Sequence, residues 1–260
     1  MKSNTNDAHY QLCYDHDCPL CVWYTGYFHQ HGYLKKEEVV PFHACNAQSL
    51  QLLNSQKMTN EIPLIDHKTQ QAFYGIDALL QVIAQKHPKA ASLAGKGFAK
   101  KTIQLLYNFI SYNRKVIVGK IPSMPHVSCD PSFHVFYRRI FIVVMTLLSL
   151  AILLAASFFA MPSNYSIAIV ALQMATLSGS FLCMHKQGIC STTASLEIGG
   201  QMVMMLLLNS VGFFINAVAF HLFQNLYFSM AILSSWQMAF VLPQWYIRVQ
   251  YTRYRVSLLA

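Results

Sequence analysis

The sequence predicts an α/β domain with a four-stranded mixed sheet, followed by an all-α region of transmembrane helices. Three observations predict this fold class. Short apolar runs alternate with amphipathic stretches in the order β-α-β-α-β-β-α before about residue 86. The chain is 54% hydrophobic and only 11% charged, which is too apolar for an ordinary soluble protein. Between Ile140 and Ile247 the only formal charges are Lys186 and Glu197, so the membrane part follows residue 139.

The first strand leads directly into a pair of cysteines. Residues 11–14 are apolar enough for a buried strand, and a helix is expected to begin at Cys18-Pro-Leu-Cys21 and to end at Gly32. Pro19 suits the first helical position, which places Cys18 at the N-cap, beside free backbone N–H groups. The sequence therefore predicts a thiol at a helix N-terminus with a second thiol one turn further along.

This placement favours thiol–disulfide exchange. A helix N-terminus stabilises the thiolate of Cys18, and Cys21 can then attack the mixed disulfide that Cys18 forms. We therefore expect Cys18 to be the more exposed, lower-pKa attacker and Cys21 the buried resolver. The competing interpretation is half of a structural zinc site, but such a site needs four ligands and the chain has no second Cys-x-x-Cys. Redox chemistry is therefore favoured, with no metal and no cofactor besides the Cys18–Cys21 disulfide.

The remaining elements of the first domain follow in sequence. Strands are expected over 39–43, 62–66 and 70–74, and helices over 46–56 and 76–86. Pro41 cannot donate to a strand ladder, so its strand is expected at the sheet edge. We expect the first and third strands to be central, the fourth to be antiparallel, and the spatial order to be second, first, third, fourth.

Four motifs of this region occur together in one order. They are Tyr14-Asp-x-Asp-Cys-Pro-Leu-Cys21, Ile62-Pro63, Tyr74-Gly-x-Asp-Ala78 and Tyr112-Asn-Arg114. With these motifs in this order, the chain resembles the DCC family of thiol-disulfide oxidoreductases over roughly residues 10–118. The resemblance implies a thioredoxin-like fold with Asp15, Cys18 and Cys21 as signature positions. It also implies that the Ile62–Pro63 bond is cis and that Pro63 contacts the cysteine turn.

Three polar residues before the thiols have open roles. The family usually has glycine where this chain has His16, which either helps to stabilise the Cys18 thiolate or only fills a solvent-facing turn. Asp15 and Asp17 are either a turn-forming pair or a source of negative charge, and a buried carboxylate can also accept the Cys21 proton. His16 and Asp17 are therefore candidate modulators.

The other five cysteines carry no predicted role. Cys13, Cys45 and Cys129 are expected to be ordinary reduced side chains, because the chain starts without a signal peptide. Cys183 and Cys190 lie in the predicted membrane region, where they are either incidental or a second pair that exchanges electrons with the first.

The positive charge is concentrated before the apolar region. Lys and Arg outnumber Asp and Glu by ten to one over 86–139, whereas residues 1–85 carry five against eight. A helix over 92–112 contributes to this basic segment, and the sequence leaves open whether it packs on the sheet or lies on a membrane surface. Basic charge beside apolar spans is typical of contact with anionic lipid on the cytoplasmic side, so nucleic-acid binding is not expected.

Four spans are predicted, near 140–160, 166–184, 199–221 and 224–247, after a soluble domain over 1–118 and a basic juxtamembrane linker over 119–139. The basic residues flanking these spans fall on one side, which predicts an integral inner or plasma membrane protein with both termini in the cytoplasm.

The sequence therefore predicts a membrane-anchored thiol-disulfide oxidoreductase. Its partners are expected to be a protein or small-molecule thiol or disulfide, the lipid bilayer and a membrane protein. The competing hypothesis is a non-catalytic thioredoxin-like binding or assembly module, or a soft-metal carrier, tethered to the membrane.

Overall fold

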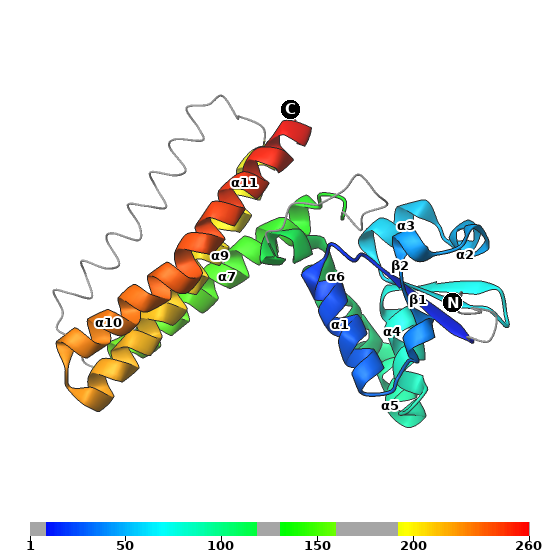
Figure 1. Cartoon of the computed structure of the whole chain (residues 1–260), viewed down its shortest axis with the longest axis horizontal. Coiled ribbons are helices and arrows are strands. Elements are labelled where there is room, and N and C mark those ends of the chain that lie inside the picture. Colours follow the sequence, from blue (N-terminus) through cyan, green and yellow to red (C-terminus); the bar gives the residue numbers. More distant parts are fainter. Residues whose placement is uncertain (1–8, 119–130, 160–191, 260) are drawn as a thin grey trace. The chain divides into compact units, whose positions relative to one another are not determined.

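The computed structural model describes residues 9–118, 131–159 and 192–259 (Figure 1). These residues form two compact units, one of residues 9–118 with 131–132 and one of residues 133–159 with 192–259. The first unit contains the sheet and the second is helical. The predicted second span, near 166–184, lies outside the described residues.

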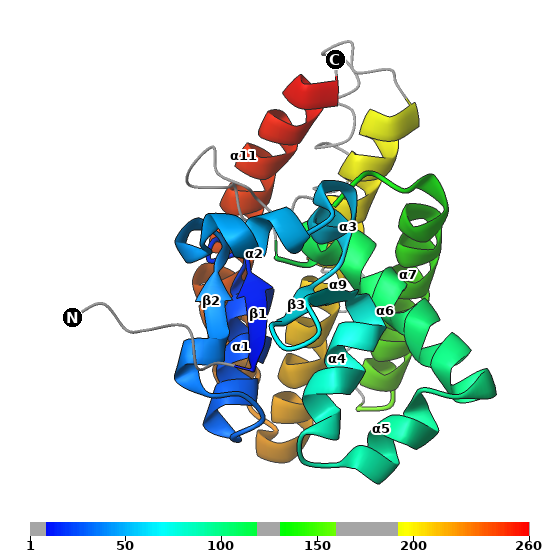
Figure 2. The same cartoon turned by 90° about the vertical axis from the view of Figure 1, so that its right-hand side faces the viewer.

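The first unit is built on a four-stranded mixed sheet. Its strands are β1 (Tyr10–Tyr14), β2 (Val39–Pro41), β3 (Pro63–Asp66) and β4 (Gln71–Tyr74). Their order is β2-β1-β3-β4, as predicted, with β1 parallel to β2, and with β3 antiparallel to both β1 and β4. Figure 2 shows β2, β1 and β3 side by side in this order. Pro41 lies on the edge strand β2, where its missing N–H costs no ladder hydrogen bond.

Helices cover both faces of this sheet because successive strand residues point to opposite sides. Leu12 and Leu64 face α1 (Pro19–Gln30), α4 (Gly75–Ala84) and α6 (Gly97–Val118), which contribute further packed side chains to this core cluster. Cys13 and Ile65 face the other way, toward α2 (Ala47–Leu52) and α3 (Ser55–Asn60). The sheet therefore lies between two helical layers.

The predicted helix over 46–56 is two short helices. Asn46 caps α2, because its side-chain oxygen accepts a hydrogen bond from the Ser49 N–H at 2.7 Å. Asn54 caps α3 in the same way, accepting from the N–H groups of Gln56 and Lys57. The second cap starts a new helix after Leu53 takes an extended conformation, which divides the single helix predicted from the sequence.

The helix predicted over 92–112 is also divided. It consists of α5 (Pro88–Ala94) and α6, which begins at Gly97 with a positive φ of 53°. The α6 side chains show which face is buried: Tyr107 packs against the core, whereas Leu106 is 59% exposed. Part of α6 therefore packs on the α/β unit, a choice that the sequence left open.

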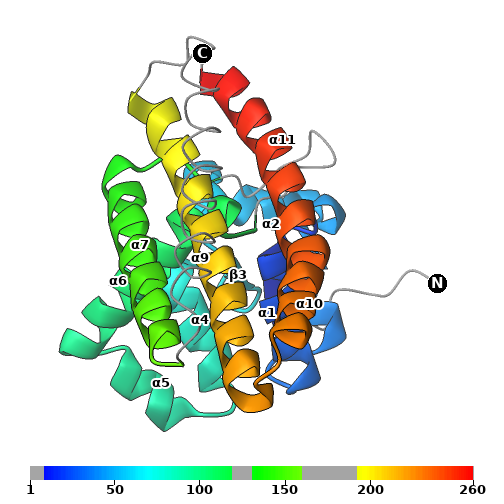
Figure 3. The same cartoon turned by 90° about the vertical axis from the view of Figure 1, so that its left-hand side faces the viewer.

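The second unit is organised around α9 (Thr192–Phe223), which packs against the other described helices of this unit. These are α7 (Val135–Ser157), α10 (Leu226–Trp236) and α11 (Leu242–Leu259), with a π-helical stretch over Gln237–Val241. Figure 3 shows α7, α9 and the α10–α11 run beside one another. The π-helical stretch shifts the backbone hydrogen-bond register by one residue where α10 continues into α11.

Among the described residues, two helices are long and apolar enough to cross a membrane, namely α7 and α9. This corrects the prediction of four spans. The predicted fourth span is helical, but α10 has only 11 residues, and its continuation, α11, has a polar composition. The apolar run of the sequence thus extends over one short helix and the start of a more polar one.

The isolated acidic residue of the apolar region has a partner in the structure. Glu197 of α9 is fully buried, and its Oε2 atom lies 3.3 Å from Nη1 of Arg138 on α7. Further along the chain, Arg248 of α11 donates a hydrogen bond of 2.6 Å to the Oε1 atom of Gln201 on α9. Each contact gives a buried arginine a polar partner on α9, and such pairing is how charged groups are tolerated in an apolar bundle.

Candidate active site

The turn between β1 and α1 is held by the backbone and side chain of Asp15. The Cys18 N–H donates to the Asp15 carbonyl oxygen at 3.2 Å, and the Asp17 N–H donates to Asp15 Oδ1 at 2.9 Å. Asp15 is 5% exposed, so its carboxylate is enclosed beside the turn. This geometry is that of an Asx turn, which favours the turn-forming role among those left open by the sequence.

The two thiols lie at the start of α1. Cys18 is the N-cap with an extended backbone, Pro19 is the first helical residue, and Cys21 lies in the first turn, as predicted. The expected difference in exposure is wrong, because Cys18 is 3% exposed and Cys21 is 2% exposed. α6 packs beside α1, and the positive charges of its buried residues Arg114 and Lys115 act on Cys18.

The electrostatic environment favours the Cys18 thiolate. Hydrogen bonding from the Cys21 thiol is the largest cause that lowers the Cys18 pKa, to about 6, against the opposing effect of burial. The Cys21 backbone amide and the positive charges of Arg114 and Lys115 lower this pKa further. Most of Cys18 is therefore ionised at neutral pH, which is the state that attacks disulfides.

Arg114 and Lys115 reach this site from the last turns of α6. Both are buried, at 5% and 6% exposure, although basic side chains are rarely enclosed without a partner. Arg114 also donates from Nη2 to the carbonyl oxygen of Thr59. Arg114 belongs to one of the four motifs, but the motif predicts no role for it; its position after an apolar helical stripe is the signal in the sequence.

Three α6 side chains, spaced at about one helical turn, bind the segment that precedes Pro63. The Tyr107 hydroxyl accepts from the Ile62 N–H at 2.9 Å, Ser111 donates to the Asn60 carbonyl oxygen, and Arg114 binds Thr59 as described above. Burial raises the pKa of Tyr107 to about 12, so this hydroxyl stays protonated. The end of α6 thus joins the cysteine environment to the start of β3.

The Ile62–Pro63 bond is trans, so the prediction of a cis bond is wrong. Ile62 is already fixed in the direction of β3: its N–H binds Tyr107, and its carbonyl oxygen accepts from the Gly75 N–H at 3.0 Å. Pro63 is the first residue of β3 and lies one position beyond the last β1 pair, Leu12 with Leu64. Its missing N–H therefore interrupts no pair with β1, and Pro63 still lies in register with Tyr74 of β4. Contact between Pro63 and the sulfurs stays a prediction.

The candidate modulators lie at the surface of the turn. His16 is exposed, its Nδ1 atom is 3.9 Å from Asp17 Oδ1, and its ring lies 5.9 Å, centroid to centroid, from that of His43 in an edge-on arrangement. This exposure favours the solvent-facing interpretation of His16. The contact with His43 brings the loop after β1 next to the loop after β2.

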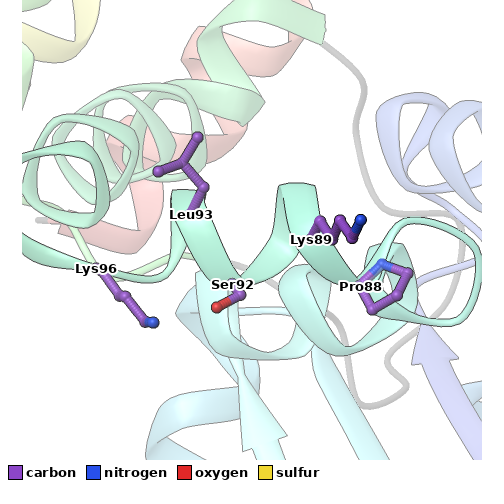
Figure 4. A pocket seen from close by; sticks show the side chains of 5 residues that line it. All are labelled: Pro88, Lys89, Ser92, Leu93 and Lys96. Atoms are coloured by element: carbon purple, nitrogen blue, oxygen red, sulfur yellow. The ribbon is translucent and has the colours of Figure 1, made fainter.

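Two further features bear on ligand binding. Within the described ranges, no three His, Cys, Asp or Glu side chains are grouped so that they could hold a metal ion. An open hollow lies on the α5 surface, and none of the predicted site residues lines it (Figure 4). Its lining residues are Pro88, Lys89, Ser92, Leu93 and Lys96.

Comparison with known proteins gives one match. Residues 12–120 match the family model described as DCC1-like thiol-disulfide oxidoreductase. No curated protein and no solved structure matches the chain. The match spans the sheet, the cysteine turn and α6, and it ends before the helical unit.

Proposed function

We propose that Cys18 and Cys21 are the pair that exchanges dithiol for disulfide, because residues 12–120 match the family model described as DCC1-like thiol-disulfide oxidoreductase. The observation that carries this proposal is the position of Cys18 as N-cap of α1 with Cys21 in the first turn. Such a helix start stabilises a thiolate and places a second thiol within reach of it. The strand order and this helix also support a thioredoxin-like arrangement.

The reaction proceeds in two displacements. The Cys18 thiolate attacks one sulfur of a substrate disulfide, forms a mixed disulfide, and releases the other substrate sulfur as a thiolate that takes up a proton. Cys21 then loses its proton and attacks the Cys18 sulfur, which expels the second substrate thiolate. Two electrons have moved to the substrate, and Cys18–Cys21 is a disulfide that a dithiol donor must reduce.

The surrounding residues have distinct parts in this proposal. Arg114 and Lys115 stabilise the Cys18 thiolate from α6, and Asp15 is a positioning residue that shapes the turn. Because Cys18 is buried, a substrate sulfur reaches it only when the covering groups move. The hydrogen bond from Arg114 to Thr59 joins the end of α6 to α3 beside this site.

The helical unit supplies the membrane anchor in this proposal. Two helices, α7 and α9, have the required length and apolar composition. Ten Lys and Arg residues over 86–139 precede or begin α7, so the positive-inside rule places the thiols in the cytoplasm, where the pair acts as a reductant or shuttle. A membrane-impermeant maleimide is expected to leave Cys18 unlabelled in intact cells and to label it after permeabilisation. Labelling without permeabilisation would overturn this orientation.

A turnover assay separates this function from a binding or assembly module. The full chain in detergent is supplied with insulin disulfides and a dithiol donor, and reduction is followed as insulin precipitation. We expect turnover above the rate of the donor alone. A rate equal to that of the donor would favour the non-catalytic module or metal carrier, which needs no exchange at Cys18.

A further inference from the structure

A second pair of thiols lies in the core of the α/β unit. The Cys45 thiol donates a hydrogen bond to the Cys13 sulfur, with 3.3 Å between the two sulfur atoms, although the residues are 32 positions apart. Both are thiols outside any disulfide; Cys13 is fully buried and Cys45 is partly exposed. A disulfide needs its sulfur atoms about 2.05 Å apart, so a small side-chain adjustment brings them to bonding distance.

The surroundings of Cys45 are arranged to hold a thiolate. Gln11 on β1 donates from its side-chain amide to the Cys45 sulfur at 3.5 Å. The amide orientation is set at its other end, where the Ser49 hydroxyl donates to Gln11 Oε1 at 2.7 Å and His67 Nε2 lies 2.9 Å from the same oxygen. Gln11 is therefore held with its N–H group toward Cys45, and not toward Ser49.

Two hydrogen bonds act on Cys45 in the same direction. The bond with Cys13 is the largest cause that lowers the Cys45 pKa, and the Gln11 amide lowers it further against the effect of burial. When Cys45 ionises, the Cys13 thiol turns and donates to it. The partner that stabilises the thiolate is thus also the thiol placed to attack it once it is modified.

The topology places this pair at the same edge of the sheet as Cys18 and Cys21. Strands β1 and β2 are parallel, so their carboxyl ends meet at one edge. Cys18 follows the end of β1 and Cys45 follows the end of β2, and the two loops touch through His16 and His43. Of the four thiols at this edge, only that of Cys45 is partly exposed, so a small disulfide that approaches the edge meets Cys45 first.

We infer that Cys13 and Cys45 form a second redox site, which takes low-molecular-weight disulfides as its oxidant. The Cys45 thiolate attacks one sulfur of the oxidant and displaces its other half as a thiol. Cys13 then loses its proton, attacks the Cys45 sulfur and displaces the second half. One Cys13–Cys45 bond and two small thiols result, and two electrons have left the pair. This site does not depend on the function proposed for Cys18 and Cys21.

The test uses the full chain with Cys18→Ser and Cys21→Ser combined, so that only the second pair remains at this edge. The protein is incubated with oxidised glutathione, and its peptides are mapped by mass spectrometry without reduction. We expect a Cys13–Cys45 disulfide that dithiothreitol reverses. No reaction at Cys45, or a bond from Cys45 to any other cysteine, would overturn the inference.

A second variant tests the order of attack. Adding Cys13→Ser removes the resolving thiol, so glutathione is expected to remain on Cys45 as a stable mixed disulfide. If Cys13→Ser instead left Cys45 unmodified while the Cys13–Cys45 disulfide formed in its parent, Cys45 would not be the attacker. Circular dichroism of each variant shows that the fold is retained.

The isosteric change Gln11→Glu provides a test that leaves all seven cysteines in place. The new carboxylate still accepts from Ser49 but repels the Cys45 thiolate instead of donating to it. Iodoacetamide labelling of Cys45 at neutral pH is expected to slow by roughly fivefold or more, while labelling of Cys18 is unchanged. An unchanged Cys45 rate would show that Gln11 does not stabilise the thiolate.

Discussion

The two thiol pairs of the α/β unit differ in how they are assembled. Cys18 and Cys21 are neighbours in sequence, and a single helix start brings them together. Cys13 and Cys45 come from β1 and from the segment after β2, so only the pairing of those two strands brings their sulfur atoms within 3.3 Å. The first pair has two buried cations beside it, whereas the second has a neutral amide.

This difference teaches what each pair is suited to do. The Cys18 pKa is lowered to about 6, with the hydrogen bond from Cys21 as the largest cause and the α6 cations adding to it, so Cys18 is the more reactive thiolate at neutral pH. The second pair lies in an apolar core cluster with Phe42 and Ile65, where oxidation joins β1 to the segment after β2. We therefore expect turnover at the first pair and slower oxidation at the second.

Replacing Cys18 tests this division most strongly. Cys18→Ser is expected to reduce insulin-disulfide turnover by at least about a hundredfold, because the attacking thiolate is lost while Cys13 and Cys45 remain. Turnover of the full chain is measured beside circular dichroism. Substantial remaining activity in a folded variant would mean that the second pair can replace the first.

Replacing the resolving thiol has a smaller effect on the first chemical step. Cys21→Ser is expected to let Cys18 attack but to leave the mixed disulfide unresolved, so covalent complexes with substrate accumulate. Non-reducing electrophoresis followed by peptide mapping locates the adduct. Adducts on Cys45 in preference to Cys18 would reverse the roles assigned to the two pairs.

The pH dependence of alkylation compares the two pairs within one sample. The Cys18 pKa is lowered to about 6, so its thiolate population rises with pH through that value and is nearly complete above it. Between pH 5 and pH 7 the labelling rate of Cys18 should increase by roughly tenfold and then level off. A rate that keeps rising to pH 9, as for an ordinary thiol, would contradict the stabilisation of this thiolate.

The contribution of the α6 cations is the smallest effect and has a matched control. Arg114→Gln removes a positive charge beside Cys18, so the Cys18 pKa should rise and labelling at pH 6 should slow by roughly threefold to fivefold. Lys101→Gln removes the same charge from an exposed position on the same helix. If both variants slowed Cys18 equally, the effect would be one of net charge and not of the local Arg114 contact.

Local sequence was sufficient wherever neighbouring residues determine the structure. It predicted Cys18 as N-cap with Pro19 after it, the end of α1 at Gly32, which has a positive φ of 63°, and the placement of Pro41 on an edge strand. Each of these depends on backbone geometry within a few residues. The order of the four strands was also predictable, because short connections and right-handed crossovers leave few alternatives.

The tertiary structure decided what depends on distant residues. The positive charges beside Cys18 come from α6, and the trans bond at Pro63 accompanies hydrogen bonds that Ile62 makes with Tyr107 and Gly75, which lie 45 and 13 positions further along the chain. Of the predicted spans that lie in the described residues, the first and the third are long apolar helices, whereas the last is divided between α10 and the more polar α11. Hydropathy reports how apolar a stretch is, but where a helix shifts its hydrogen-bond register depends on the packing of its neighbours.

The second thiol pair shows this limit most clearly. Cys13 and Cys45 have no motif, since their spacing carries no information until β1 and β2 are paired. Once the strands lie side by side, two side chains that the sequence treats as unrelated share a hydrogen bond and a common donor network through Gln11. Sequence determines contacts made along one element, and only the folded chain determines which elements meet.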